Sequence, residues 1–173
     1  MRELKKYIEI GKIINTRGIR GEVKIEPWSD SPDALRGVRC FYFADGSSIP
    51  VLGSRVLGGR FLLATLEGIN TPEAAEKLKG KVISARREEI KKAAGDVFIC
   101  DMIGLPVIDC ESGTVYGTLR EVTDGVAQKI YSVKTEKGDV LIPAVPEFIR
   151  EIDVEKGIFI KPIAGFFDES EEV

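Results

Sequence analysis

The sequence predicts a mainly β fold: two small β-barrels joined by a short linker, with one short α-helix in the N-terminal domain. Three observations support this fold class. Short apolar stretches alternate with a period of two residues, glycine-rich turns separate them, and the pattern restarts after a charged segment near residue 90. Because tight turns join only antiparallel strands, this spacing favours small barrels over a parallel sheet.

The first predicted strands are residues 7–14 and 21–27, in which apolar and polar side chains alternate. Gly18–Gly21 provides the turn between them. An Asp-Gly pair within residues 41–53 is a hairpin signal between two apolar stretches. A Gly-Gly pair within residues 54–68 repeats that arrangement, so four or more short strands are expected here.

A short helix is predicted within residues 71–80. Thr71 can accept hydrogen bonds from the amides of the first turn as N-cap, Pro72 suits the first helical position, and Gly80 can end the helix. Lysine in the last turn would complement the helix dipole. Residues 81–86 then return as a strand.

The charged segment at residues 87–96 lacks strand alternation and predicts a linker, or a loose helical turn, without core residues. Beyond it, strands are predicted over residues 97–109, 114–122, 129–135, 140–145 and 157–163. Five or so strands with short turns leave no room for long crossover connections, which predicts a second small barrel.

The predicted domain limits are therefore residues 1–90 for the first barrel, 91–95 for the linker, 96–168 for the second barrel and 169–173 for an acidic tail. A chain of 173 residues is long enough for two small domains. No apolar stretch approaches the ~20 residues of a membrane span, and the first residues lack a signal-peptide pattern. We therefore expect a cytoplasmic protein that makes no membrane contact, and nothing in the sequence demands more than a monomer.

The charge differs between the two halves of the chain. Residues 1–92 carry 18 Lys and Arg against 12 Asp and Glu, a balance of +6. The remaining residues carry 7 against 16, a balance of −9. Ordinary solvated surfaces could have these charges, but opposite signs in two domains favour two surfaces with different partners.

Several kinds of chemistry are excluded by residue types that are missing. The chain has no histidine, which rules out Ser-His-Asp and Cys-His nucleophiles and removes a usual zinc ligand. Its three cysteines form no CxxC pair and no closed disulfide framework, so reduced, partly buried thiols are expected. The carboxylates match no metal-binding spacing and mostly lie beside turn glycines. We expect no catalytic residue, no metal and no cofactor.

The stretch NTRGIRGEVKI at residues 15–25 places Arg17, Arg20 and Lys24 beside a tight turn. Guanidinium groups suit phosphate oxygens because their planar fork donates two hydrogen bonds. The stretch is neither a P-loop nor a dinucleotide fingerprint, since it has no GK[ST] ending and no helix follows it. It predicts a hairpin turn whose side chains either contact phosphates or form ordinary surface charge.

Two apolar features have a surface interpretation and a core interpretation. The stretch LIPAVPEF at residues 141–148 could offer a partner a rigid edge, because its prolines fix backbone angles and remove donors. Burial of Leu141, Ile142 and Val145 in the core is the alternative that we favour. Trp28 could stack on a nucleic-acid base, although a single tryptophan more often belongs to the core.

Four segments resemble, in order, the RimM ribosome maturation factors. The N-terminal GKIINTRGIRGEVKIEPWSDSPD and the helix TPEAAEKLKGKVI are similar to that family's first domain. The later DMIGLPVIDCESGTVYGTLREV and VLIPAVPEFIREIDVEKGIFI resemble its C-terminal PRC-barrel domain. Family members commonly have a histidine where this chain has Arg17, and often an aromatic pair where it has Val97-Phe98.

The resemblance implies a non-catalytic assembly factor that binds the head of the immature small ribosomal subunit and assists its maturation and 16S rRNA processing. The implied partners are 16S rRNA and small-subunit ribosomal protein nineteen, a basic protein that an acidic barrel would complement. The expected rRNA-binding residues are Arg17, Gly18, Arg20, Gly21 and Lys24. The residues expected to bind the ribosomal protein are Val97, Phe98, Asp101, Pro143, Val145 and Pro146.

A second hypothesis belongs to another class of protein. Barrels similar to the first one occur in reductases, and PRC barrels occur in photosynthetic electron-transfer complexes. The chain could therefore be a cofactor-binding or electron-transfer-associated protein, although its sequence has no cofactor motif. Bound flavin or haem would absorb visible light, whereas an assembly factor would not.

Overall fold

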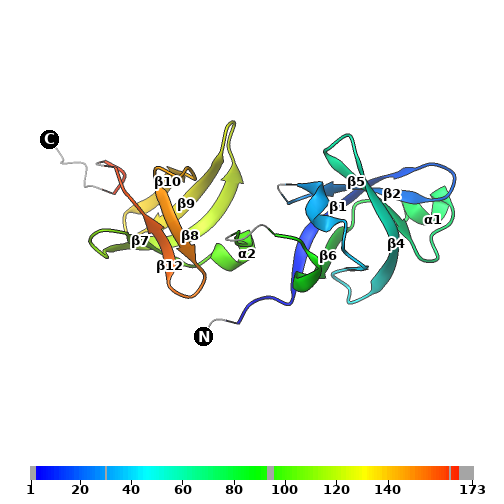
Figure 1. Ribbon diagram of the computed structural model, residues 1–173, viewed down its shortest axis with the longest axis horizontal. Coiled ribbons are helices and arrows are strands. Elements are labelled where there is room, and N and C mark those ends of the chain that lie inside the picture. The colour runs from blue at the N-terminus through cyan, green and yellow to red at the C-terminus, as the bar shows by residue number, and fades with distance from the viewer. Residues whose placement is uncertain (1–2, 30, 93–95, 164, 168–173) are drawn as a thin grey trace. The chain divides into compact units, whose positions relative to one another are not determined.

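The computed structural model of the protein describes residues 3–29, 31–92, 96–163 and 165–167. The chain divides into two compact units, each built mainly of β-strands (Figure 1). The first unit comprises Lys5–Ala94, and the second comprises Gly95–Val173 together with Met1–Leu4. The predicted fold class, mainly β in two domains, is confirmed.

The detailed domain limits stay a prediction. Residues 93–95 of the expected linker and the expected acidic tail at 169–173 lie outside the described residues.

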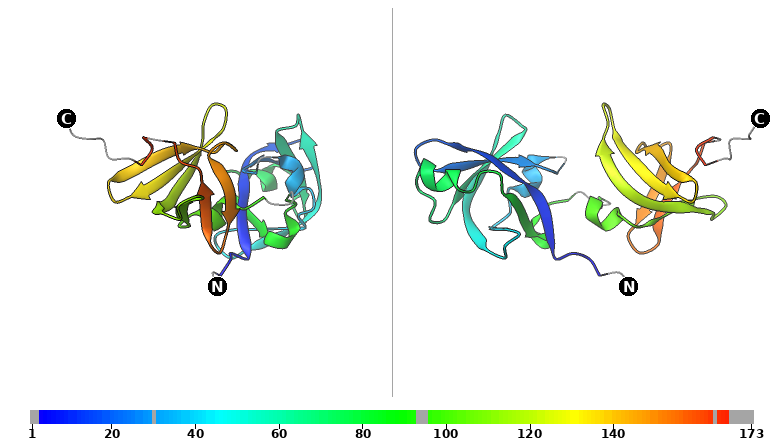
Figure 2. Two further views of the ribbon diagram at one scale, coloured as in Figure 1. Left: turned by 60° about the vertical axis from the view of Figure 1, so that its left-hand side comes forward. Right: turned by 180° about the vertical axis from the view of Figure 1, so that it is seen from behind.

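The first unit is a closed barrel whose strands are hydrogen-bonded in the order β1-β2-β5-β4-β3-β6 (Figure 2). Its strands are β1 (Tyr7–Arg17), β2 (Glu22–Pro27), β3 (Cys40–Tyr42), β4 (Ser48–Leu57), β5 (Phe61–Leu66) and β6 (Val82–Arg86). All three predicted turns join these strands. The largest fully buried side chains of the barrel are Ile13, Ile25, Leu35, Phe41, Leu62, Leu63, Leu66 and Ile83.

The helix α1 (Pro72–Glu76) is capped as predicted, because the Thr71 hydroxyl accepts a hydrogen bond from the amide of Ala74 at 3.2 Å. It is shorter than expected. Lys77 is already the C-cap, so the prediction of a lysine in the last helical turn is wrong. Gly80, at φ 87°, follows the helix, and its amide donates to the Ile13 carbonyl at 2.7 Å. That bond ties the helical segment to β1.

The segment after β6 belongs to the barrel more closely than predicted. A 3₁₀ turn at Arg87–Glu89 leads to Ile90, which is only 9% exposed. The amide of Lys91 then donates to the Ala34 carbonyl at 3.0 Å. The prediction that residues 87–96 contribute nothing to a core is therefore wrong, because Ile90 covers apolar side chains of the first unit.

The second unit contains a six-stranded sheet in the order β10-β9-β8-β7-β12-β11. Neighbouring strands are antiparallel except for β7 and β12, which are parallel. Its elements are α2 (Ile99–Met102), β7 (Pro106–Asp109), β8 (Val115–Asp124), β9 (Lys129–Thr135), β10 (Gly138–Pro143), β11 (Ile149–Asp153) and β12 (Gly157–Ile160).

Two elements of this unit differ from the sequence prediction. Residues 97–109 were expected as one strand, but they form α2 and then β7. Apolar residues at 99, 102 and 103 have helical spacing, and Met102 is buried in the core of the unit. Strand β11 was not predicted, because three of the five residues in its sequence IREID are charged and its two isoleucines are three residues apart, which is not strand alternation.

Aspartates stabilise several turns of both units. The Asp109 carboxylate accepts from the amides of Glu111 at 2.8 Å and Ser112 at 3.2 Å and from the Tyr116 hydroxyl at 2.9 Å. The Asp153 carboxylate likewise accepts from the two amides of the turn between β11 and β12. These hydrogen bonds, first of all those from backbone amides, lower the pKa of both carboxyl groups.

A contrast between two glycines tests the packing of the barrel against α1. Gly18 and Gly21 both have positive φ, at 69° and 78°. A Cβ at Gly18 would meet no atom within 4 Å, whereas one at Gly21 would lie 2.6 Å from the Thr71 carbonyl oxygen. We expect Gly18→Ala to cost about 1–2 kcal/mol of unfolding free energy and Gly21→Ala about 2–5 kcal/mol, measured by chemical denaturation. Equal losses of unfolding free energy in the two variants would show that the close approach to Thr71 does not add to the cost of Gly21→Ala.

Acid should unfold the protein partly through Asp109. Since its pKa is lower in the folded chain, its ionised form stabilises the fold above the unfolded pKa, and this contribution is lost as pH falls through the folded pKa. We expect the melting temperature of Asp109→Asn to fall less than that of the unsubstituted protein between about pH 5 and about pH 2. Parallel pH curves for the two proteins would contradict this.

Candidate functional site

The predicted basic turn lies at one end of the β1–β2 hairpin. Arg17 and Glu22 are paired across the hairpin, so Gly18–Gly21 closes it as a four-residue connection. Ile19 at its tip is 88% exposed, and Arg17 and Arg20 are exposed as well. Of the predicted residues, Arg17, Gly18 and Arg20 are therefore exposed at this turn, whereas Gly21 is buried against Thr71 and Lys24 is a half-buried residue of β2.

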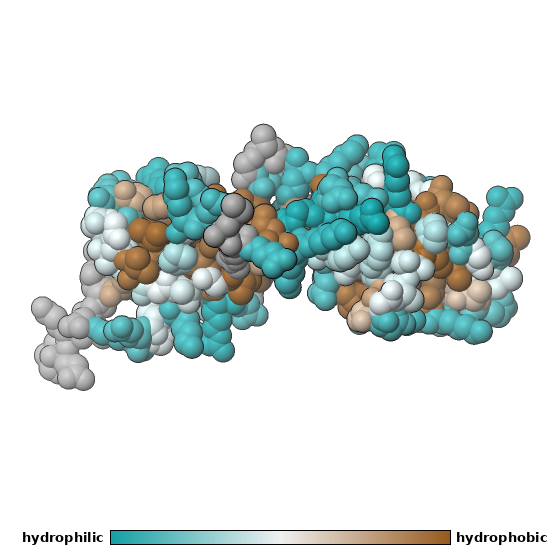
Figure 3. Space-filling view, turned by 90° about the horizontal axis from the view of Figure 1, so that it is seen from below, coloured by the Kyte–Doolittle hydropathy of each residue, from teal (hydrophilic) through white to brown (hydrophobic). Residues whose placement is uncertain are grey.

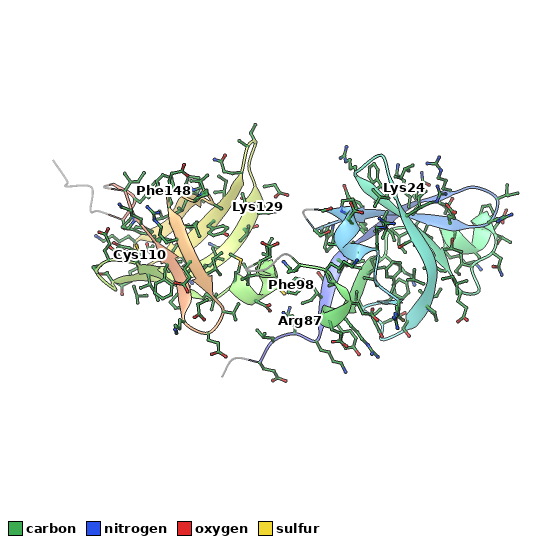
Figure 4. All side chains as sticks on the ribbon, in the orientation of Figure 1. Lys24, Arg87, Phe98, Cys110, Lys129 and Phe148 are labelled. Atoms are coloured by element: carbon green, nitrogen blue, oxygen red, sulfur yellow. The ribbon has the colours of Figure 1, made fainter. Side chains whose placement is uncertain are left out.

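Neighbouring strands add cations that the sequence analysis missed. Lys24 Nζ lies 4.0 Å from the centre of the Phe61 ring, and the Arg60 guanidinium lies 5.1 Å from the same ring (Figure 4). Arg55 Nη2 donates to Glu22 Oε2 at 2.7 Å. We call Arg17, Arg20, Lys24, Arg55 and Arg60, with Glu22 and Phe61, the turn face.

The chemistry of the turn face is that of an anion-binding surface. It combines four guanidinium groups and one ammonium group with the Glu22 carboxylate, and the exposed Glu26 occupies the next outward position of β2 after Lys24. The Phe61 ring holds Lys24 by a cation–π contact, which limits the motion of that ammonium group. Arg60 follows the Gly58-Gly59 turn. A second glycine turn beside a basic residue was the sequence pattern that could have indicated Arg60 as a site residue.

Of the residues expected to bind a protein, Val97, Phe98 and Asp101 lie at α2. Phe98 is the N-cap residue of α2, and its carbonyl accepts from the Asp101 amide at 2.9 Å. Val97 packs against the core of the unit. Asp101 is only 4% exposed, and its Oδ1 lies 3.7 Å from Cys100 Sγ. A carboxylate this deeply buried presents little of its surface to a partner.

Pro143, Val145 and Pro146 lie where β10 ends. The amide of Ala144 donates to the Lys129 carbonyl at 2.8 Å, and the amide of Val145 donates to the Pro143 carbonyl at 2.9 Å. Pro146 is exposed, whereas Pro143 and Val145 are half-buried. Figure 4 shows Phe148, just beyond this segment, well away from Phe98. The two expected groups thus come from different elements, one at α2 and the other at the end of β10.

Apolar side chains reach the surface of both units on the face drawn in Figure 3. Leu141 is 62% exposed while its neighbour Ile142 is fully buried, so the core interpretation holds for Ile142 and is wrong for Leu141. Trp28 is 48% exposed, which contradicts its expected place in the core. Alternation on an edge strand explains Leu141, because successive side chains point to opposite faces.

The cysteines and carboxylates show little clustering. Cys40 and Cys100 are half-buried, but Cys110 is exposed, contrary to expectation. Within the described ranges, no group of three or more Cys, Asp and Glu side chains is placed to hold a metal ion. No helix in the described part of the chain is long and apolar enough to span a membrane.

Comparison with known proteins finds one family for both units. Residues 8–90 match the RimM N-terminal domain, and residues 99–161 match the RimM PRC barrel domain. The ribosome maturation factor RimM of Clostridioides difficile is 33% identical over 172 residues, which cover 97% of this chain and all of that protein. The ribosome maturation factor RimM of Caldanaerobacter subterraneus is 34% identical over 159 residues, covering 89% of this chain and 94% of that protein.

A crystal structure of a RimM from Pseudomonas aeruginosa is 27% identical, covers 92% of this chain and 99% of its own, and has a TM-score of 0.45. The two domain matches run in the order of the two units, and together they span most of the chain. The relatives from Clostridioides difficile and Caldanaerobacter subterraneus cover 97% and 89% of this chain. The chain therefore belongs to the RimM family of ribosome maturation factors.

Proposed function

We propose that the protein is a non-catalytic assembly factor that binds the immature small ribosomal subunit and assists its maturation. In this proposal the first unit contacts 16S rRNA through the turn face, and the second unit contacts small-subunit ribosomal protein nineteen. Membership of the RimM family supports a role in ribosome assembly. The observation that supports the RNA contact most directly is the turn face itself.

The turn face has the properties that RNA phosphates require. Its cations come from β1, β2 and β4 and from the turns that precede β2 and β5. Because β2 and β5 are antiparallel, these two turns lie at opposite ends of the pair, and the cations are spread along the outer side of the strands. Only Arg55 is paired with a carboxylate within the face. Arginine forks donate to phosphate oxygens in pairs, and each phosphate contact releases condensed counterions. The turn face therefore fits a polyanion with little rearrangement.

The second unit fits a basic protein partner. Residues 93–173 carry a net charge of −9, which complements a basic surface. On β10, Asp139, Leu141 and Pro143 occupy alternate positions of one edge strand. Val145 and Pro146 continue that surface, and we keep Val97 and Phe98 as a second proposed contact. Asp101 would act by supporting α2.

Removing the turn-face cations tests the RNA contact. We expect replacement of Arg17, Arg20 and Lys24 by alanine to weaken co-sedimentation with immature small subunits. Each lost phosphate contact should reduce the slope of log affinity against log salt by about 0.7–0.9. Unfolding free energy should fall by about 1 kcal/mol or less, because the exposed Arg17 and Arg20 contribute little to stability and Lys24 contributes mainly its cation–π contact with Phe61.

The matched control replaces Arg36, Lys77 and Lys79, three exposed cations elsewhere on the first unit, by alanine. This control removes the same charge and should leave the salt slope unchanged. If the turn-face variant folds and binds like the unsubstituted protein, the turn face is an ordinary basic surface and the RNA contact lies elsewhere.

A cation placed on β10 tests the protein contact. We expect Leu141→Lys to weaken binding of small-subunit ribosomal protein nineteen to the full chain by about tenfold, since it adds a like charge to an apolar contact. Val126→Lys is the matched control, because Val126 is fully exposed on the loop between β8 and β9. Calorimetric titration measures both variants. Equal affinities for the two would exclude β10 as the contact.

A further inference from the structure

A second feature of the first unit has no part in the proposed contacts. The outer face of the barrel contains a hollow of about 370 Å³, within the usual range of small-molecule sites. Its walls include the rings of Tyr7, Tyr42 and Phe43. The ring centres of Tyr7 and Tyr42 lie 4.7 Å apart with their planes tilted by 55°.

Strand register explains why a hollow forms here. Glu9 of β1 pairs with Ser84 of β6, Ser84 pairs with Tyr42 of β3, and Tyr42 pairs with Ser48 of β4. Paired residues lie side by side on one face of a sheet, so these four side chains form one row across the barrel. Serines between larger neighbours leave space that the aromatic rings surround.

Three cations lie against the three rings. Lys6 Nζ is 5.7 Å from the centre of the Tyr7 ring, and Lys81 Nζ is 5.2 Å from that of Phe43. The Arg86 guanidinium is 5.9 Å from the centre of the Tyr42 ring, and its Nε donates to the Tyr42 hydroxyl at 3.0 Å. The hollow is therefore aromatic with three cations at its edge, and carboxylates lie beside two of them, because Asp45 interacts electrostatically with Lys81 and Glu88 with Arg86.

The hollow also contains a hydrogen-bond acceptor. The side chains of Tyr7 and Glu9 are exposed while Ile8 and Ile10 between and beyond them are buried, so Tyr7 and Glu9 share the outer face of β1. Glu9 lines the hollow, and within the described part of the chain its carboxylate has no hydrogen-bond or ion-pair partner. An ionised carboxylate only accepts hydrogen bonds.

We propose that this hollow binds one unstacked base of single-stranded RNA. The base stacks on Tyr7, its Watson–Crick edge donates to the Glu9 carboxylate, and the flanking phosphates contact Lys6, Lys81 and Arg86. Aromatic rings with surrounding cations are the usual means by which proteins hold single-stranded nucleic acid. This inference rests on the proposed RNA-binding function and adds to it a second, base-reading site.

The carboxylate selects among the bases. Guanine offers two adjacent donors, N1–H and N2–H₂, that match the two oxygens of a carboxylate. Adenine and cytosine each offer one amino group. The uracil N3–H lies between two carbonyl oxygens, which a carboxylate repels. The expected order of affinity is guanine first, then adenine and cytosine, then uracil.

An aromatic hollow with one carboxylate could also suit a quaternary ammonium ion. The three cations argue against that occupant, because they would repel a positive ligand and they already lie against the rings. The same cations favour a polyanion. The cations that already lie against the rings thus argue against a cationic ligand, and they can pair with the phosphates of RNA.

The hollow is separate from the turn face. Tyr7 and Arg17 are the first and last residues of β1, and ten residues of strand span about 30 Å. A chain of RNA could contact both sites only by following the barrel from one end of β1 to the other. Changes at the two sites should therefore affect binding independently.

Fluorescence anisotropy of the full chain with oligouridine octamers that carry one central G, A, C or U tests the proposal. We expect the octamer with G to bind most tightly. Tyr7→Leu should weaken its binding about tenfold, because the base loses its stacking partner. The slope of log affinity against log salt should stay the same, because no phosphate contact is lost. Tyr7→Phe, which keeps the ring, should bind like the unsubstituted protein, and Glu9→Gln should abolish the preference for G.

Three results would overturn the proposal: equal affinity for the four octamers, unchanged binding by Tyr7→Leu, or displacement of the octamer by millimolar tetramethylammonium, which would indicate a cation site. Circular dichroism checks that each variant is folded, and Glu9→Gln decides the matter alone if Tyr7→Leu unfolds. A negative result with the octamers would not contradict the proposed contact between the turn face and RNA phosphates. Failure of the turn-face variant, with octamer binding intact, would instead contradict the proposed phosphate contact.

Discussion

The closed barrel of the first unit depends on β1 being hydrogen-bonded along both edges, to β2 on one side and to β6 on the other. Each ladder contains one irregularity along β1, between Glu9 and Gly11 toward β6 and between Ile13 and Asn15 toward β2. Such bulges bend a strand and increase its twist, which a six-stranded barrel requires. Gly11 permits this path, because a Cβ there would lie 2.4 Å from the carbonyl oxygen of Glu26. A side chain at this position would force β1 and β2 apart.

The same strand connects the fold to its proposed functions. One end of β1 carries Arg17 and the turn face, and the other carries Tyr7 and the aromatic hollow. The barrel holds both ends in fixed register, so neither surface needs a partner to organise it. The second unit is built differently: its sheet ends in two edge strands, β10 and β11, and β10 presents Leu141 outward over a buried Ile142. The basic unit thus presents donors, stacking surfaces and fixed charge, whereas the acidic unit presents an apolar strand edge.

Sequence patterns of a few neighbouring residues predicted the turns and the helix, because those elements are stabilised by contacts between residues close in sequence. The capped helix at Thr71, the Gly18–Gly21 turn and the Asp45-Gly46 hairpin each follow from a few neighbouring residues. Features that depend on distant residues were missed. Ile90 is buried because the chain returns to Ala34, and α2 replaces part of a strand because Met102 fills the core of the second unit. Arg55 and Arg60 join Lys24 only through the pairing of β2, β5 and β4. The hollow likewise arises from the register of four strands, which no short stretch of sequence encodes.

Contact between the first unit and RNA at both ends of β1 can be measured on whole subunits. Ultraviolet cross-linking of the full chain to purified immature small subunits, followed by mass spectrometry of the peptides joined to RNA, locates these contacts. We expect cross-linked peptides that contain Tyr7 or Tyr42 and, separately, peptides from the Arg17–Lys24 hairpin. Cross-links confined to the second unit, or none from the first, would contradict this expectation.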